Sequence, residues 1–331
     1  MEPLHRYFSI LNGSALPMFM LARCVPIGVE LSAPTERLWE EHDRALGKLH
    51  GLMREEHIEE ASPSLLDLKC ELARRMLEAC EFCERKCRVN RHTRMGWCRV
   101  GDVSYVSSEF LHMGEEWELV PSHTIFFCGC TFECVYCQNW EISQYPEAGV
   151  PASPSKLAER IHTRHMQGSK NVNFVTPTPH VHTVLETLLH LDVPVPVVWN
   201  SNMYHSTAAG KLLEGVVDVY LGDLKYGSDA CAKRLSHVER YWEVVSRNFV
   251  HASRMGELLI RHLVLPSHVE CCTRPIVEWV GEHLPHALFN LMFQYRPEYR
   301  AREHPDIARG LSQEEMERAL LLAERLKWLH R

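Results

Sequence analysis

The sequence predicts an α/β protein built on a partial barrel of six strands that alternate with helices, a (βα)6 arrangement. Short β-branched and aromatic segments recur between residues 124 and 294, and amphipathic segments lie between them. Polar residues follow the end of each apolar segment. Such alternation places parallel strands in one sheet with right-handed crossovers, and ligands gather at the carboxyl ends of those strands.

Each barrel element can be assigned a range. The expected strands cover residues 124–128, 172–175, 195–199, 216–221, 258–264 and 288–294. The expected helices cover residues 153–167, 180–191, 204–213, 228–251, 275–283 and 312–329. Ser153 and Pro154 provide the N-cap and first-turn proline of the first of these helices.

The first 118 residues lie outside this alternation. Residues 1–34 mix proline and glycine with apolar residues and are expected to be irregular but packed. Helical spacing of apolar residues predicts one helix over 35–60 and another from Ser62-Pro63 to Cys80, and alternation over 103–120 predicts a short β segment. We therefore expect a helical extension at 1–71, a four-cysteine metal-binding module at 72–118 and the partial barrel at 119–331.

Composition narrows the functional class. The 331 residues carry 36 Lys and Arg against 43 Asp and Glu, a formal charge of −7, which argues against nucleic acid as a partner. Thirteen cysteines without a recognisable secretory signal indicate a cytoplasmic protein that uses its thiols for metals or redox chemistry. The longest apolar run near the start falls well short of the ~20 residues of a membrane span, so no membrane association is expected.

Three cysteines follow the first barrel strand with C-x3-C-x2-C spacing: Cys130, Cys134 and Cys137. Thiolates this close indicate one shared metal centre. A 4Fe–4S cluster usually takes four cysteines, so three would leave one iron open, as in reactive metal sites. The alternative is that Cys128 adds a fourth thiolate and closes a structural or electron-carrying centre, although its place on a buried strand favours a core role.

A second cysteine group lies upstream with C-x2-C-x3-C-x10-C spacing: Cys80, Cys83, Cys87 and Cys98. Four thiolates are the complete set of a structural zinc or of a saturated iron–sulfur cluster, so we expect a second metal site and leave zinc or iron open. An electron relay and free thiols are the alternatives. Arginines and a lysine crowd the same loop and would stabilise thiolates, or else form a solvated basic face.

Polar residues at the expected strand ends are the candidates for binding a cofactor. Each alone could be a cap, a turn or a surface charge, but their shared position points to one site. They are Thr176 and Thr178 after the second strand, Asn200 after the third, Asp223 and Lys225 after the fourth, Arg261 on the fifth, and Arg296 after the sixth.

Several stretches of residues 80–331 resemble the iron–sulfur branch of proteins homologous to pyruvate formate-lyase activating enzyme, within the radical S-adenosylmethionine (SAM) superfamily. The matching stretches are Cys-x2-Cys-x3-Cys-Arg-Val-Asn-Arg, His-Met-Gly-Glu-Glu, Ser-His-Thr-Ile-Phe-Phe-Cys-Gly-Cys, Tyr-Cys-Gln-Asn-Trp-Glu-Ile-Ser, Arg-His-Leu-Val-Leu-Pro and Gln-Tyr-Arg-Pro-Glu-Tyr. The resemblance implies a 4Fe–4S cluster on Cys130, Cys134 and Cys137, with SAM on its open iron beneath Tyr136. It also implies that Asp223-Leu224-Lys225 holds the ribose and the methionine carboxylate.

Two stretches depart from the family pattern. A Gly-Gly-Glu-like turn that receives the methionine amino group is replaced by Val-Thr-Pro-Thr-Pro-His at 175–180, and the Tyr-His of the activating enzymes reads Tyr295-Arg296. Neither departure touches the cysteines.

The resemblance implies an enzyme that cleaves SAM to a 5'-deoxyadenosyl radical and abstracts a hydrogen atom, with a glycine of a partner protein as the possible target. Flavodoxin or ferredoxin would be the reductant. One alternative is radical modification of a small molecule or another side chain. The other is a non-catalytic iron–sulfur protein for electron transfer or scaffolding.

Overall fold

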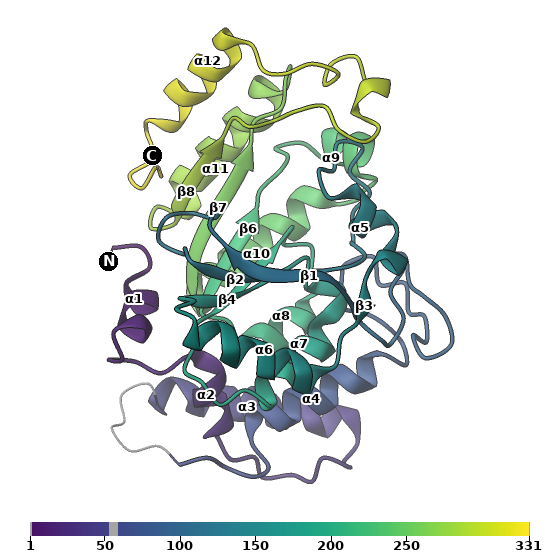
Figure 1. The fold of residues 1–331 in the computed structure, drawn as a ribbon, viewed down its shortest axis with the longest axis vertical. Coiled ribbons are helices and arrows are strands. Elements are labelled where there is room, and N and C mark those ends of the chain that lie inside the picture. The colour runs from purple at the N-terminus through teal and green to yellow at the C-terminus, as the bar shows by residue number, and fades with distance from the viewer. Residues whose placement is uncertain (1, 53–58, 331) are drawn as a thin grey trace.

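An eight-stranded sheet forms the centre of the protein, as a computed structural model describes it for residues 2–52 and 59–330 (Figure 1). The strand order is β3-β1-β2-β4-β5-β6-β7-β8. Strands β2 and β4 to β8 are parallel neighbours, whereas β1 and β3 are antiparallel additions at the β2 edge. Within the described residues the sheet does not close on itself. The predicted α/β class, with six βα strands in an open barrel, is confirmed.

The parallel strands are short and almost wholly buried, because helices cover one face and the barrel interior covers the other. Their bounds lie within a few residues of the predicted ranges. The strands are β1 Tyr105–His112, β2 Ser122–Phe127, β3 Val150–Pro151, β4 Asn171–Val175, β5 Val197–Ser201, β6 Val219–Asp223, β7 Glu257–Leu263 and β8 Leu288–Met292.

Helices alternate with these strands and pack on the outside of the sheet (Figure 1). A short helix follows the cysteine loop, and single turns of 3-10 or π helix precede or follow several longer helices. The helices are α5 Trp140–Gln144, α6 Pro154–Met166, α7 Val181–Leu189, α8 Thr207–Leu213, α9 Asp229–Ser236, α10 Tyr241–Met255, α11 Arg274–His283 and α12 Gln313–Ala323, with η1 Pro146–Ala148, η2 Thr178–His180, η3 Val269–Thr273 and η4 Ala301–Glu303.

Two of the predicted helices have the wrong extent. The single helix expected over 228–251 is two helices, α9 and α10, separated where His237 and Arg240 adopt left-handed backbone with φ of 54° and 49°. The last helix ends at Ala323 rather than near residue 329. The chain then turns to pair with β8, where the Phe289 amide donates to the carbonyl of Trp328 at 2.9 Å.

The prediction that residues 1–34 are irregular is also wrong, because they contain α1 His5–Leu11 and α2 Met18–Arg23. The first amides of α1 donate to the carboxylate of Glu257, from Leu4 at 3.0 Å and from Arg6 at 2.6 Å. Leu4 and Tyr7 pack against strand residues from β5 to β8. Helix α1 therefore closes the amino-terminal end of the barrel.

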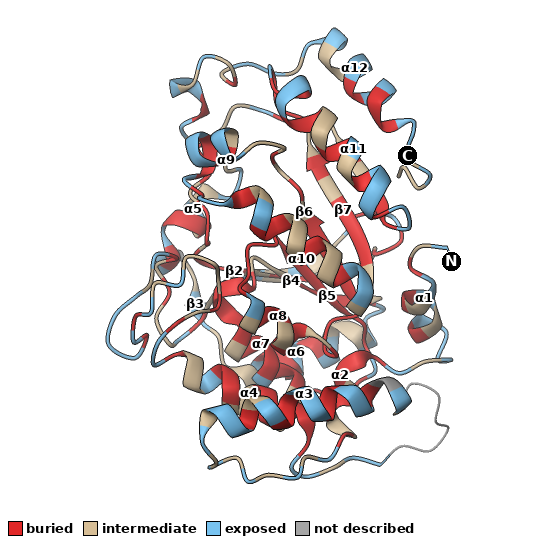
Figure 2. Cartoon of the chain, turned by 180° about the vertical axis from the view of Figure 1, so that it is seen from behind, coloured by how far each residue is buried: buried red, intermediate tan, exposed pale blue. Residues whose placement is uncertain are grey.

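Helices α3 Thr35–Leu52 and α4 Leu65–Met76 confirm the two helices expected after residue 34. The predicted continuation of the first helix to residue 60 falls mostly on residues 53–58, which lie outside the described residues. Ser64 and Asp67 form a capping box at the start of α4. Buried faces of α3 and α4 point to the barrel (Figure 2). The division of the chain at residues 71 and 118 stays a prediction.

None of the helices that the structure describes combines the length and the apolar character that a membrane crossing requires.

Candidate functional site

A cavity of about 460 Å³ opens at the carboxyl ends of the parallel strands. Its walls come from the cysteine loop after β2 and from the residues that end β4, β5, β6 and β7. This position is the one that the parallel topology predicts for a ligand site. Of the residues singled out in the sequence as ligands of the barrel cluster or of the cofactor, those lining the cavity are Cys130, Cys134, Tyr136, Cys137, Thr176, Thr178, Asn200, Asp223, Lys225 and Arg261.

Each of the three loop cysteines has a polar neighbour at its sulfur. The Phe132 amide donates to the Sγ of Cys130 at 3.4 Å, and the hydroxyl of Ser143 lies 3.4 Å from the Sγ of Cys137. The Ser236 hydroxyl donates to the Sγ of Cys134 at 2.9 Å. Hydrogen bonds of this kind stabilise thiolate sulfur and tune iron–sulfur clusters.

A chain of hydroxyl groups connects Tyr136 to this sulfur. Tyr136 Oη lies 2.7 Å from Tyr226 Oη, which lies 2.5 Å from Ser236 Oγ. Because Ser236 uses its one hydrogen for Cys134, Tyr226 must donate to Ser236, and Tyr136 must donate to Tyr226. Tyr136 is thereby fixed under the cavity by a chain with a single direction. Ser236 had no signal in the sequence, since it lies 102 positions from Cys134.

Lys225 and Asp223 form an ion pair in the cavity wall, with 2.7 Å between Nζ and Oδ2. Burial lowers the pKa of Lys225, but the charges of Asp223 and Cys134 raise it more, so that the net pKa lies above its usual value. The ammonium is thus held charged between a carboxylate and the cysteine loop. Such a group can bind the carboxylate of a ligand, and Asp223 keeps lone pairs for hydroxyl donors.

Two threonines that follow β4 are unusual, one in its backbone conformation and the other in its buried hydroxyl. Thr176 has a φ of 58°, a left-handed conformation that is costly for a β-branched residue and typical of functional sites. The Oγ1 of Thr178 is buried in the cavity wall, and the described residues offer it no hydrogen-bond partner. An unpartnered hydroxyl at this point fits a ligand ammonium, the group that a bound SAM would bring.

Arg261 lines the cavity, but its guanidinium is bonded to acidic side chains. It donates to Glu116 Oε1 at 2.8 Å and to Oε2 at 2.6 Å, and it also pairs with Glu115. Asn290 on β8 donates to the same Glu116 at 2.7 Å. Residues 115 and 116, from the quoted His-Met-Gly-Glu-Glu stretch, thus tie the segment between β1 and β2 to β7 and β8. The sequence reasoning gave these glutamates no role.

Arg296 and Cys128 are not among the residues that line the cavity. The guanidinium of Arg296 is largely exposed and pairs with Glu298 at 2.8 Å. Cys128 is fully buried, and its carbonyl accepts a hydrogen bond of 2.9 Å from the Nε2 of His180. The structure therefore brings three cysteines to the cavity and leaves Cys128 in the core.

The four upstream cysteines lie together between α4 and β1. The neighbouring Cys80 thiol lowers the pKa of the Cys87 thiol, and Gly96 packs beside the sulfurs of Cys87 and Cys98. Among the described residues, no three of these four sulfurs lie within 4.8 Å of one another. A cluster of several irons holds its cysteine sulfurs farther apart than one ion does, so this spacing bears on zinc alone, and the second metal site, with zinc or an iron–sulfur cluster, stays a prediction.

This four-cysteine module contacts the loop that holds Cys130. The Nε of Arg85 donates to the carbonyl of Thr131 at 2.7 Å. Gly129, at a φ of +85°, lies so close to the Cys98 carbonyl that a Cβ would stand 2.6 Å from it. A side chain at position 129 would push the two cysteine groups apart, which explains the glycine.

Two comparisons of sequence bear on the family. Residues 124–280 match the family model described as the radical SAM superfamily. The chain is 47% identical over 332 residues to an uncharacterized protein of Methanocaldococcus jannaschii, and the match covers 97% of each chain.

Two solved structures are similar in part. The crystal structure of Streptococcus suis SuiB bound to precursor peptide SuiA is 12% identical, with a TM-score of 0.44, and the match covers 59% of this chain and 43% of that one. Methylornithine synthase PylB is also 12% identical, with a TM-score of 0.47, over 98% of this chain and 77% of that one.

The family match covers the segment from β2 to α11, which supplies the three-cysteine loop and the cavity-wall residues from Thr176 to Arg261. Residues 124–280 form a radical SAM superfamily domain.

Proposed function

We propose that this protein cleaves SAM reductively at a 4Fe–4S cluster on Cys130, Cys134 and Cys137, and abstracts a hydrogen atom from a substrate. The observation that carries the proposal is that the three thiols, the Asp223–Lys225 pair and the unpartnered hydroxyl of Thr178 share one cavity. When bound, the cluster supplies the electron that converts SAM to methionine and a 5'-deoxyadenosyl radical.

The chain's own residues bind and shield the reactants. The ammonium of Lys225 suits a methionine carboxylate, and the carboxylate of Asp223 suits ribose hydroxyls. Thr178 can accept from the methionine ammonium and so fills the place of the missing glycine-rich turn. Buried aromatic rings close the cavity behind the loop: Tyr136 packs at right angles to Tyr226 and edge-on to Tyr295.

The first experiment is anaerobic reconstitution with iron and sulfide, reduction with dithionite in the presence of SAM, and detection of 5'-deoxyadenosine. Variants with alanine at Cys130, Cys134 or Cys137 should form none, whereas Cys128→Ala should retain activity. Loss of activity in a folded Cys128→Ala variant would favour a closed, four-thiolate centre. A reconstituted wild-type protein that never cleaves SAM would favour the electron-transfer or scaffold alternative.

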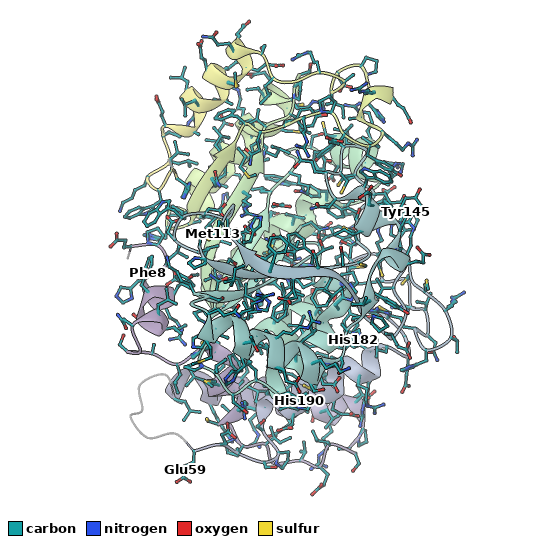
Figure 3. The ribbon with its side chains drawn as sticks, in the orientation of Figure 1. Phe8, Glu59, Met113, Tyr145, His182 and His190 are labelled. Carbon is teal, nitrogen blue, oxygen red and sulfur yellow. The ribbon has the colours of Figure 1, made fainter. Side chains whose placement is uncertain are left out.

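As the substrate we propose first a glycine Cα of a partner protein, because its radical is delocalised between two amides. Large apolar side chains at Phe110, Met113 and Trp117 are exposed along β1 and the segment after it, where the barrel is open. Figure 3 shows Met113 at this edge. Exposed apolar groups beside a site are typical of protein contact surfaces.

A small molecule is the second candidate. The bonds from Glu115 and Glu116 to Arg261 draw the segment between β1 and β2 across to β7, which narrows the lateral opening through which a peptide would enter. Deuterium labelling separates the candidates: label from α-deuterated glycine in a partner protein should enter 5'-deoxyadenosine. Transfer from a metabolite fraction alone would favour the small molecule.

An acidic one-electron donor such as flavodoxin or ferredoxin is the reductant that we propose. The side chains of Lys86, Arg88 and Arg94 are exposed around the four-cysteine module, which contacts the Cys130 loop through Arg85. This basic surface suits an acidic donor. Raised ionic strength should therefore slow reduction by flavodoxin far more than reduction by dithionite.

A further inference from the structure

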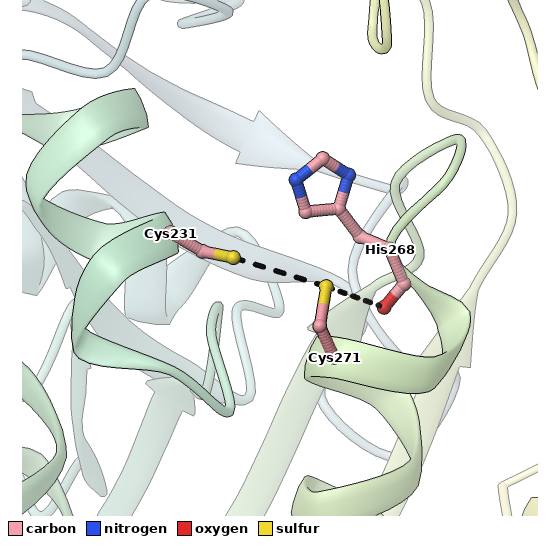
Figure 4. A group of neighbouring side chains, drawn as sticks. All are labelled: Cys231, His268 and Cys271. Carbon is pink, nitrogen blue, oxygen red and sulfur yellow. Dashed lines mark hydrogen bonds between the residues drawn. The ribbon is translucent and has the colours of Figure 1, made fainter.

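A second group of potential metal ligands lies outside the cavity (Figure 4). Among the described residues, Cys231, His268 and Cys271 are the one set of three metal-ligating side chains whose ligand atoms all lie within 4.8 Å of one another. The sulfurs of Cys231 and Cys271 are 3.8 Å apart. This separation matches the ~3.8 Å expected between two sulfurs on one tetrahedral zinc with bonds of ~2.3 Å.

The hydrogen bonds of His268 fix the imidazole in the form that a metal requires. A backbone carbonyl can only accept, so Nδ1 donates to the Pro266 carbonyl at 2.7 Å. The guanidinium of Arg234 can only donate, so Nε2, 3.0 Å away, offers its lone pair. Metal-binding histidines usually hold their second nitrogen on a carbonyl or carboxylate in this way. A metal ion at Nε2 would take the position next to this nitrogen that the Arg234 guanidinium now occupies. Arg234 would still form its ion pair with Asp306.

The backbone around these residues is also unusual. His268 immediately precedes the π-helical turn η3, which carries Cys271, and π turns are rare and frequent at functional sites. A third thiol, that of Cys272, lies 3.9 Å from the sulfur of Cys271. Cys231 lies on α9, so the group joins two different βα connections. No feature of the linear sequence relates residue 231 to residues 268–271.

We propose that Cys231, His268 and Cys271 bind a zinc ion through two thiolates and one imidazole, with water in the fourth position. The ion would fasten α9, which follows β6, to η3, which follows β7. Helix α9 ends at Ser236, the residue that donates to Cys134, so the zinc would hold in place the helix that contacts the cluster cysteine. Thiolate and imidazole ligands favour zinc over calcium or magnesium.

The test is the zinc and iron content of whole protein reconstituted without oxygen and then equilibrated with Zn²⁺. Cys271→Ser and Cys231→Ser should each hold about one zinc ion fewer per chain than wild type, with iron unchanged. Cys24→Ser, at the C-cap of the distant helix α2, is the matched control and should retain the wild-type zinc content. Cys271 is exposed, so its serine variant is the one most readily accommodated.

A chelator should lower the melting temperature of wild type by more than it lowers that of Cys271→Ser, because a bound ion stabilises only the folded state and the variant lacks this one ion. Wild-type zinc content in a folded Cys271→Ser variant would overturn the proposal. So would a Cys231–Cys271 disulfide, detected by mass spectrometry, in protein purified without oxygen. Metal content is measured without SAM, so failure here is distinguishable from failure of the proposed radical chemistry.

Discussion

The hydroxyl of Ser236 donates a hydrogen bond of 2.9 Å to the sulfur of Cys134. The bond joins the last residue of α9 to the second cysteine of the loop, and it is supported by the Glu133 amide, which donates to the Ser236 carbonyl at 3.2 Å. Donors to sulfur stabilise the more negative, reduced state of an iron–sulfur cluster. Ser236 is therefore placed to set the cluster's potential without touching a substrate.

Removing this donor should make the cluster harder to reduce. A hydrogen bond worth about 1 kcal/mol corresponds to about 40 mV for one electron, so Ser236→Ala should lower the reduction potential by roughly that amount. A redox titration followed by electron paramagnetic resonance measures the shift. Ser246→Ala, on α10, is the control and should leave the potential unchanged. An unchanged potential in Ser236→Ala would show that the bond does not tune the cluster.

Replacing Lys225 should weaken SAM binding. A charge-assisted hydrogen bond contributes about 1.5–3 kcal/mol, so Lys225→Ala should raise the dissociation constant of SAM by roughly ten- to a hundredfold. Equilibrium binding to the reconstituted protein measures it. Lys233→Ala removes an exposed lysine that pairs with Glu239 and should bind SAM like wild type. If Lys225→Ala bound SAM as tightly as Lys233→Ala does, Lys225 would not be part of the SAM site.

Thr178→Val separates a binding role from a packing role. Valine has nearly the same shape but lacks the buried hydroxyl that has no partner in the described residues. The SAM-free variant should be more stable than wild type by about 1 kcal/mol, because an unpartnered hydroxyl is costly to bury. Its SAM affinity should fall several-fold. Denaturant unfolding and SAM titration measure the two effects, and a loss of stability with unchanged affinity would contradict the assignment.

His262 should make the protein less stable in acid. Burial lowers the pKa of this histidine to about 4, and its nitrogens bond to the Leu224 carbonyl at 2.7 Å and to the Thr273 hydroxyl at 2.9 Å. The unfolded chain takes up the proton below about pH 6.5, whereas the folded chain does so only below about pH 4. Between these values the unfolded state gains the proton, so stability falls as the pH falls.

The loss from His262 amounts to about 3 kcal/mol between pH 6.5 and pH 4. The free energy of unfolding, measured with urea, should therefore fall less between pH 7 and pH 4.5 for His262→Gln than for wild type, and the two changes should differ by about that amount. If the variant and wild type showed the same pH dependence of stability, the pKa of His262 would have to be the same in the folded and the unfolded chain.

The barrel could be predicted because its strands are buried on both faces, so each one is a short apolar segment that can be recognised from neighbouring residues alone. Thr178, Asp223 and Lys225, which the sequence singles out because they follow strand ends, all line one cavity, and their role in binding stays a prediction. What could not be predicted depends on distant contacts. The ion pairs of Arg261 could not be predicted, because nothing near it in the sequence shows that Glu115 and Glu116 reach it from the other side of the barrel.

Distant contacts also account for some of the other differences between prediction and structure. Helix α1 has no side-chain cap of its own, because Glu257 on β7 accepts from its first amides. The helices α9 and α10 are predicted as one helix because neither Gly nor Asn, the usual left-handed residues, marks the break at His237 and Arg240. Arg296 follows its strand as expected, but the chain there turns outward and the side chain pairs with Glu298 at the surface.

The anchoring of α1 on β7 has a consequence for synthesis. Leu4 and its acceptor Glu257 are 253 positions apart, so α1 cannot dock during synthesis until these 253 residues have followed it. At ~5–20 residues per second this delay exceeds about 10 s. During that time Leu4 and Tyr7 lack the strand residues that later cover them. The docking of α1 therefore follows the synthesis of β7, and the order of assembly runs from the barrel back to α1.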